Sequence, residues 1–367
     1  MSRKRLKPPT QLADDLVSDR RRFLESMALS AGAIAMLTGA GATRTARAQS
    51  PGQSSALPQV TSSQPPPLKD LAGKTAYITA AADGIGLGIA RACSNAGMKV
   101  VIGYRNEQRL QQALPLFKPG APVHAIRHDV TDRDGWTKLL EEVKGTFGNL
   151  HLLVNNAGVK TLAKASEAKV ELWDNCVAVN FTAIYNGVMT CIPHMRAHGE
   201  GGHIVTTASM GGLLPGASAG AGVYTATKIA AVGLMEALRI ELCGSNIGTS
   251  AFCPGIVMTD NRPESQRTPP HPPPPSAPPR PHFEAMDPLE AGERVLNGVR
   301  NNDLFILTHP EFRDGMQERC DAVMSSVPEE ATPPPPGRVA FEKYVLRSPI
   351  YAPETAHRRI KRKSYRS

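Results

Sequence analysis

Tyr224 and Lys228 lie four residues apart in the stretch YTATK. On a helix, residues at positions i and i+4 share a face, so this spacing would place a phenol beside an ammonium group. The ammonium would favour the phenolate, whose formation otherwise needs a pH of about 10. The pair could therefore act as an acid/base at physiological pH, or it could be two exposed helix residues that happen to be neighbours.

A second candidate is the stretch TAAADGIG, Thr79 to Gly86. It follows an apolar segment and opens a helical one, so it is expected at a strand-to-helix turn. Glycines in such a turn allow the backbone to approach a pyrophosphate, and the helix amino terminus attracts the negative charge. The alternative is a plain tight turn.

These residues belong to a regular alternation of short apolar segments and helical patterns, which predicts parallel strands covered by helices on both faces. We expect an α/β fold: a single doubly wound Rossmann-type domain over residues 69–327, with a seven-stranded parallel sheet. The expected strands lie in residues 74–80, 99–104, 123–130, 150–158, 202–209, 247–255 and 303–309. The expected helices lie in residues 84–97, 106–114, 131–148, 173–198 with a boundary or kink at Pro193, 224–243 and 287–301.

Two proline-rich segments interrupt or end this pattern. Residues 262–282, RPESQRTPPHPPPPSAPPRPH, cannot hold regular helix or sheet hydrogen bonding and are predicted to be an insertion in the substrate-loop region. The insertion is either passive, in part as polyproline II, or a ligand for a partner domain. Residues 328–367 are predicted to be a proline-rich and basic C-terminal tail.

Residues 1–48 have the three-part plan of an export signal: DRRRFLE, an apolar run, and a small-x-small site ending at Ala48. Arg20 and Arg21 resemble the pair of a twin-arginine signal, which implies recognition by the twin-arginine export machinery and a periplasmic protein. An uncleaved membrane anchor and a start site placed too far upstream remain alternatives. Residues 49–68, rich in Ser, Gln and Pro, are expected to be a flexible linker.

The formal net charge of +9 comes from the two ends of the chain. Residues 1–48 carry +5 and residues 357–367 carry +6, which leaves the rest at −2. A nucleic-acid-binding face on the folded domain is therefore not expected. The six cysteines form no CxxC pair and no Cys/His set with zinc spacing, so no metal site is expected either.

A series of short motifs follows the order found in the short-chain dehydrogenase/reductase family, which the chain resembles over residues 69–327. Thr79–Gly86 matches the family's TGxxxGxG, with Ala80 in place of the first glycine. The other matches are Asp129 after the third strand, Asn155–Gly158 for NNAG, Asn180, Ser209, Tyr224 with Lys228 for YxxxK, and Pro254–Thr259 for PGxVxT. The interval from Ser209 to Tyr224 is two residues longer than expected, which a small Gly/Ala-rich loop insertion would absorb.

The resemblance implies an NAD(P)-dependent oxidoreductase that interconverts an alcohol and a carbonyl in a small-molecule substrate. Tyr224 would be the general acid/base, Lys228 would favour the phenolate and bind the nicotinamide ribose, Ser209 would hold the substrate oxygen, and Asn180 would maintain a water path from Lys228. The implied cofactor contacts are Thr79, Ala81, Asp83, Gly84, Ile85, Gly86, Tyr104, Arg105, Asp129, Val130, Asn156, Ala157, Gly158, Tyr224, Lys228, Pro254, Gly255, Val257 and Thr259. The family also implies a homo-oligomer formed through the helices containing residues 173–198 and 224–243.

Cofactor choice is expected to depend on the end of the second strand, GYRNEQ. A carboxylate there would bind the 2′-hydroxyl of NAD, but this chain has Tyr104 and then Arg105, which could pair with a 2′-phosphate. NADP is therefore favoured over NAD, with Asp83 near the phosphates arguing mildly the other way. Two further hypotheses remain open: a non-catalytic nucleotide-binding protein with the same fold, and a membrane-attached scaffold.

Overall fold

A computed structural model describes residues 65–218, 220–259, 285–328, 348, 350–352 and 354–356. All of them belong to one unit of the chain, Val60–Glu329 with Ser348–Ser367. The predicted export signal, most of the linker, the proline-rich insertion and most of the C-terminal tail lie outside the described residues.

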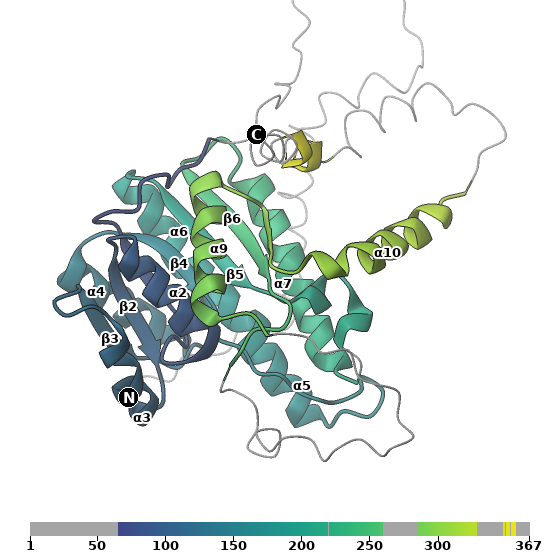
Figure 1. Cartoon of the computed structure of the whole chain (residues 1–367), viewed down its shortest axis with the longest axis horizontal. Helices are drawn as coiled ribbons and strands as arrows, with labels where there is room; N and C mark the ends of the chain where they lie inside the picture. The colour runs from purple at the N-terminus through teal and green to yellow at the C-terminus, as the bar shows by residue number, and fades with distance from the viewer. Residues whose placement is uncertain are drawn as a thin grey trace, which may run out of the picture. The chain divides into compact units, whose positions relative to one another are not determined.

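Seven parallel strands form one sheet in the order β3-β2-β1-β4-β5-β6-β7 (Figure 1). The order reverses between β1 and β4, the arrangement of a doubly wound sheet, and the predicted fold class is confirmed. The strands are β1 Thr75–Ile78, β2 Lys99–Tyr104, β3 Val123–Arg127, β4 Leu150–Asn155, β5 Gly202–Thr207, β6 Ile247–Cys253 and β7 Phe305–Leu307.

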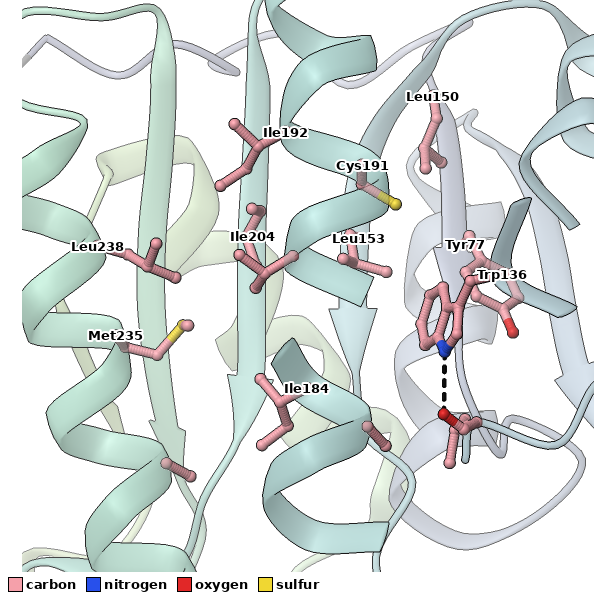
Figure 2. Close-up of a cluster of buried hydrophobic side chains, with 14 of the residues drawn as sticks. Tyr77, Trp136, Leu150, Leu153, Ile184, Cys191, Ile192, Ile204, Met235 and Leu238 are labelled. Atoms are coloured by element: carbon pink, nitrogen blue, oxygen red, sulfur yellow. Dashed lines mark hydrogen bonds between the residues drawn. The ribbon is translucent and has the colours of Figure 1, made fainter. Parts of the chain in front are cut away.

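Helices cover both faces of the sheet, because alternate strand residues point to opposite sides and both sides are apolar. One core cluster packs Tyr77 and Leu153 against α4 Arg133–Phe147, α6 Ala183–His198 and α7 Gly222–Glu241 (Figure 2). The other packs Ile78 and Val154 against α2 Gly84–Asn95, α3 Glu107–Ala113 and α9 Pro288–Asn301.

Helices α2 and α9 touch through two glycines. A Cβ at Gly88 would lie 1.9 Å from the carbonyl oxygen of Pro288, and one at Gly292 would lie 2.4 Å from the carbonyl oxygen of Gly88. No side chain fits at either position, so the backbones of the two helices are in contact. This close approach fixes α2, whose amino terminus faces the carboxyl edge of the sheet.

The helical stretch before β5 differs from its prediction in where it is interrupted. Helix α5 Val170–Val177 passes into a π-helical turn, η3 Ala178–Thr182, and then into α6, which continues through Pro193. The expected boundary or kink at Pro193 is therefore wrong as a helix end. By length and composition residues 170–198 could cross a membrane, but more than half of the tested window is buried inside the protein, as in a core helix.

Beyond β7, a short 3₁₀ turn at Pro310–Phe312 leads into α10 Arg313–Ser325, which has no buried residue. A part of the predicted tail packs on the domain. Tyr351 donates a hydrogen bond to Glu236 Oε1 over 2.8 Å, and the amide of Leu304 donates to Glu354 Oε1 over 3.2 Å. The predicted domain limit at residue 327 stays a prediction.

Candidate active site

The turn between β1 and α2 has the backbone that its glycines suggest. Ala80 and Gly84 have φ of 51° and 50°, in the left-handed region. A Cβ at Gly86 would lie 2.4 Å from the carbonyl oxygen of Ala80 and 2.6 Å from Asn156 Nδ2, so only glycine fits there. The departure from the family glycine at Ala80 is therefore accommodated by a strained alanine and not by a different turn.

The amino terminus of α2 is not capped by a side chain. Asp83 occupies the N-cap position, but its carboxylate makes no capping hydrogen bond and instead pairs with Arg109 of α3. The first-turn amides of α2 thus lack a side-chain acceptor, and an uncapped helix amino terminus suits a pyrophosphate. By this test, the residues present fit a dinucleotide.

Thr79 joins β1 to the segment that follows β4. Its buried hydroxyl oxygen accepts hydrogen bonds from the amides of Asn156 and Ala157, both over 2.8 Å. Asn156 Nδ2 donates back to the Thr79 carbonyl over 3.1 Å, and Asn156 Oδ1 accepts from Thr207 Oγ1 over 3.2 Å. These bonds hold the NNAG segment against the glycine turn.

The ends of β2 and β3 bring an arginine to an aspartate. Arg105 Nη1 lies 3.3 Å from Asp129 Oδ2, and both side chains are about half exposed or more. Hydrogen bonds from the amide and hydroxyl of Thr131, and then Arg105, hold the pKa of Asp129 below its usual value. An exposed pair of this kind contributes little to stability, so the contact leaves Arg105 able to change partner.

Two neighbouring residues complete this end of the site. Tyr104 forms a side-chain hydrogen bond with Glu107, which raises the pKa of its phenol. Val130 is buried, and its carbonyl oxygen accepts from Trp136 Nε1 over 2.9 Å, the dashed line in Figure 2. The loop that carries Asp129 is thereby fixed to the core.

Tyr224 and Lys228 lie together on α7, as their spacing predicts. Lys228 Nζ is 5.6 Å from the centroid of the Tyr224 ring. Its hydrogen bond, however, runs to the carbonyl oxygen of Thr207 over 2.7 Å. Burial lowers the pKa of Lys228 to about 8, so its ammonium is the predominant form at neutral pH.

The side chain of Tyr224 is partly buried, and burial raises the pKa of its phenol. A side-chain hydrogen bond from Ser209 opposes this shift. The expectation that Lys228 favours the phenolate stays a prediction, because the hydrogen bond of the ammonium runs to the Thr207 carbonyl. Ser209 Oγ is itself held by the amide of Gly211 over 3.1 Å.

The interval between Ser209 and Tyr224 is filled by two short 3₁₀ turns, Met210–Gly212 and Pro215–Ser218. The two turns thus occupy the interval that the sequence marks as longer than expected. Leu214 lies against Gly315 of α10, so the loop is packed at this residue.

Asn180 is fully buried in the π-helical turn. Its Oδ1 accepts from the amide of Val159 over 2.8 Å, and its Nδ2 donates to the carbonyl oxygen of Val159 over 2.9 Å and to Thr227 Oγ1 over 3.1 Å. The two bonds to Val159 fix the orientation of the amide. A Cβ at Gly158 would lie 3.3 Å from Asn180 Oδ1 and 3.5 Å from Lys228 Nζ, so both groups lie close to Gly158.

The segment after β6 returns to the glycine turn. A Cβ at Gly84 would lie 3.1 Å from Thr259 Cγ2, and Val257 pairs with Met286 in an isolated bridge. The amide of Gly255 donates to Thr308 Oγ1 over 3.0 Å, which ties Pro254 and Gly255 to the end of β7. Residues 260–284, which follow, lie outside the described part of the chain.

Most of the residues named from the sequence gather along the carboxyl edge of the sheet. The Ala81 side chain is buried in the core, the Ile85 side chain is partly buried against it, and the Ala81 amide is bonded to the Gly103 carbonyl; their roles as cofactor contacts stay predictions. Arg109, Thr207 and Thr227 also contact the site, and no fixed position of a motif marks them, because each is defined by a partner that is distant in the sequence.

A family model described as short chain dehydrogenase matches residues 74–270, which include every element of the site up to Thr259. The chain belongs to this family.

Known members of the family resemble the chain over most of its length. The C alpha-dehydrogenase of Sphingobium sp. is 32% identical over 290 residues, 72% of this chain and 90% of that protein. A solved structure from Novosphingobium aromaticivorans, named as a short-chain dehydrogenase, is 33% identical with a TM-score of 0.64, covering 80% of this chain and 99% of that chain. A short chain dehydrogenase/reductase from Burkholderia phymatum in complex with NAD is 28% identical with a TM-score of 0.61, covering 72% and 99%.

Membership gives the coarse chemistry of this short-chain dehydrogenase. The protein is an oxidoreductase of an NAD(P)-binding family, and its substrate is a small molecule. The glycine turn and the uncapped amino terminus of α2 suit a pyrophosphate, and the Tyr224–Lys228–Ser209 group lies further along the same edge of the sheet.

Proposed function

We propose that the protein interconverts an alcohol and a carbonyl, with Tyr224 as the general acid/base of the reaction. The observation that carries the proposal is the buried ammonium of Lys228, 5.6 Å from the centroid of the Tyr224 ring, with the Ser209 side chain acting on the same phenol. The bound nicotinamide supplies or accepts the hydride.

The roles of the side chains follow from their contacts. Ser209 Oγ accepts a hydrogen bond from the amide of Gly211, and its side chain lowers the pKa of the Tyr224 phenol, so its hydroxyl is placed to hold a substrate oxygen beside that phenol. Tyr224 donates the proton to a carbonyl oxygen in reduction and removes it from a hydroxyl in oxidation. Lys228, charged at neutral pH, stabilises the phenolate once its ammonium turns from the Thr207 carbonyl towards the phenol oxygen.

Asn180 is proposed to hold the backbone on the far side of Lys228. Its amide is bonded to both polar backbone groups of Val159, which follows Gly158, the residue beside the Lys228 ammonium. By holding this backbone in place, Asn180 maintains the water path along which Lys228 regains a proton.

The test is a screen of secondary alcohols and carbonyl compounds with NADP, NADPH, NAD and NADH, following the absorbance of the reduced nicotinamide. Tyr224→Phe should lower kcat by about 10²- to 10⁴-fold, the contribution of a general acid/base. Tyr185→Phe, at an exposed tyrosine on α6, is the matched control and should keep full activity. Equal activity in the wild type and Tyr224→Phe would remove the proposed role.

We favour NADP as the cofactor because one arginine follows β2 and another contacts the amino terminus of α2. Arg105 pairs with Asp129, and Arg109 pairs with Asp83, while Tyr104 stands where a carboxylate would bind the 2′-hydroxyl of NAD. Either guanidinium can exchange its carboxylate for a 2′-phosphate. The relative from Burkholderia phymatum was solved with NAD, which makes the comparison of both nucleotides necessary.

Titration of NADPH and NADH by their fluorescence tests this preference. Arg105→Gln and Arg109→Gln should each weaken NADPH by about tenfold or more, the size of one charge-assisted hydrogen bond, and change NADH less than threefold. Arg196→Gln, at an exposed arginine on α6, is the control. An equal loss for both nucleotides would show that the arginines do not read the 2′-phosphate.

We also propose that the protein is exported in folded form by the twin-arginine route, on the pattern of residues 1–48. Because free nicotinamide nucleotide is scarce outside the cytoplasm, the enzyme would leave with its cofactor bound and be turned over in place by a second substrate. The exported protein should begin at Gln49 and release nucleotide on denaturation. A cytoplasmic protein, or an exported one without nucleotide, would contradict this.

A homo-oligomer is proposed from the family resemblance and from the apolar side chains that α5, α6 and α7 leave exposed. Trp173, Met189 and Ile229 are each more than a third exposed. Light scattering coupled to gel filtration should give a mass at least twice that of one chain. Met189→Lys should lower that mass without changing the helix content.

A further inference from the structure

Two histidines hold the first residue of β4. The amide of Leu150 donates to His194 Nε2 over 3.0 Å, and His198 Nε2 donates to the Leu150 carbonyl over 3.0 Å. His194 and His198 lie one turn apart at the end of α6, so both rings point to the same strand residue. Imidazole groups therefore replace the sheet bonds at the point where β4 begins.

A third histidine extends this contact to two other strands. His151 Nδ1 accepts from the amide of Thr75, the first residue of β1, over 3.2 Å, and its Nε2 lies 2.9 Å from Glu200 Oε2. Glu200 precedes β5, and its amide donates to His198 Nδ1 over 3.1 Å. We name His151, His194 and His198 the histidine cluster; adjacent rings are 5.0 and 5.2 Å apart by their centroids.

The hydrogen bonds determine the protonation state of the cluster. Each of the three rings accepts a backbone N–H, so in each ring that nitrogen must carry a lone pair, and the ring is neutral. A second proton would turn the acceptor into a donor and leave two N–H groups facing each other. Protonation therefore breaks the backbone contacts at the starts of β1, β4 and β5.

The surroundings of the cluster disfavour additional positive charge. Burial lowers the pKa of His151, with the bond to Glu200 acting in the opposite direction and Lys74 in the same one. Burial also lowers the pKa of His194, as do the neighbouring His198, Lys144 and His151, while Glu141 raises it. The charged groups facing the cluster are Lys74 before β1, Lys144 and Glu141 on α4, and Glu200 before β5.

His151, His198 and Glu200 could also bind a metal ion, since their ligand atoms lie within 4.8 Å of one another. Their hydrogen bonds favour protonation of the rings over metal binding. Both nitrogens of His151 and of His198 already have protein partners. Lys74 Nζ, 3.3 Å from Glu200 Oε2, already places a cation on the carboxylate.

We propose that the histidine cluster is an acid-operated latch, which holds the amino-terminal edge of the sheet closed when its rings are neutral and opens that edge in mildly acidic solution. This edge is opposite the one that carries Tyr224, and the proposal does not depend on the reaction of the enzyme.

The sign follows from proton linkage. A histidine in an opened segment titrates near its ordinary pKa of about 6.5, whereas His151 and His194 in the closed cluster titrate lower. Opening therefore takes up protons, so the latch is fully closed above about pH 6.5 and the open population grows as the pH falls below that value. Each such histidine contributes up to about a tenfold change per pH unit.

Hydrogen exchange of the full chain, followed by mass spectrometry at pH 7.5 and 5.5 and corrected for intrinsic rates, measures this opening. Peptides containing the amides of Thr75, Leu150 and Glu200 should lose protection about tenfold or more at pH 5.5. The peptide containing the Val159 amide, bonded to Asn180 at the other edge, should not change. Equal loss of protection at both edges would indicate global acid unfolding and would overturn the proposal. The buried His203, whose pKa is lowered to about 3, would be the cause of such unfolding.

Substitutions that keep the acceptor but cannot titrate isolate the cluster. The amide oxygen of His194→Gln takes the place of Nε2 and that of His151→Asn the place of Nδ1. The double variant should lose most of the pH response, and His124→Gln, at an exposed histidine on β3 paired with Glu142, should retain it. An unchanged pH response in the double variant would refute the latch. So would micromolar Zn²⁺ that slows exchange of these amides at pH 7.5 in the wild type but not in the double variant. If the double variant does not fold, the wild-type exchange data decide.

Discussion

Ala80 is an exposed alanine in a backbone conformation that L-residues rarely adopt. Its φ is 51°, and apart from Asn302 it is the only non-glycine residue with positive φ among the residues that the structure describes. Its methyl group is exposed, so it buries little apolar surface. Replacing Ala80 by glycine should therefore relieve strain without loss of packing.

The expected size follows from two opposing contributions. The left-handed region costs an L-residue about 1–2 kcal/mol, which Ala80→Gly recovers. Glycine also makes the unfolded chain freer, which costs about 0.4–1 kcal/mol. The net effect is a stabilisation of about 0.5–1 kcal/mol, or a rise in Tm of about 1–4 °C for a domain of this size.

The neighbouring alanine is a matched control with the opposite sign. Ala81 is fully buried in the core cluster under α2 and has no positive φ. Ala81→Gly therefore removes a buried methyl group, relieves no strain, and increases the conformational entropy of the unfolded chain. It should lower stability by about 1–2 kcal/mol. Urea unfolding at pH 7.5, followed by circular dichroism, compares both variants with the wild type. Ala80→Gly at or below wild-type stability would refute the assignment of strain to this turn.

Three further substitutions test the site. Gly86→Ala would place its Cβ 2.6 Å from Asn156 Nδ2, so we expect at least a tenfold loss of NADPH affinity by fluorescence titration; unchanged affinity would mean that the turn can shift. Thr79→Val leaves the amides of Asn156 and Ala157 without their acceptor and should cost about 2–4 kcal/mol in urea unfolding, whereas Thr79→Ser should be close to wild type. Burial lowers the pKa of Lys228 to about 8, below its unfolded value of about 10.4. Between pH 8 and 10 the unfolded chain therefore binds more protons, and the wild type should gain stability relative to Lys228→Met as the pH rises. Parallel stability profiles of the two proteins would show that the ammonium is not desolvated.

The fold could be predicted from the sequence because hydrophobic periodicity is a local signal. Seven apolar segments alternating with helical patterns lead to the parallel sheet, and the expected strand positions hold, although β7 is limited to Phe305–Leu307. The interruption near Asn180 could not be predicted in this way. A π-turn differs from an α-turn by one residue, and the partners that stabilise it, Val159 and Thr227, are distant in the sequence.

By itself, the sequence determined which groups would be available at the carboxyl edge of the sheet. Tyr224 with Lys228, Asn156 with Gly158, and Thr79 are each placed by a strand end or by a helical spacing of four. Such positions depend only on local geometry, which the chain specifies through its own periodicity.

Only the tertiary structure decided what those groups contact. It placed the Lys228 ammonium on the Thr207 carbonyl, paired Arg109 with Asp83, and brought His194 and His198 to Leu150. Hydrogen bonds and ion pairs depend on atoms approaching within about 3 Å, and between residues distant in the sequence that approach is set by how helices pack on the sheet and not by spacing along the chain.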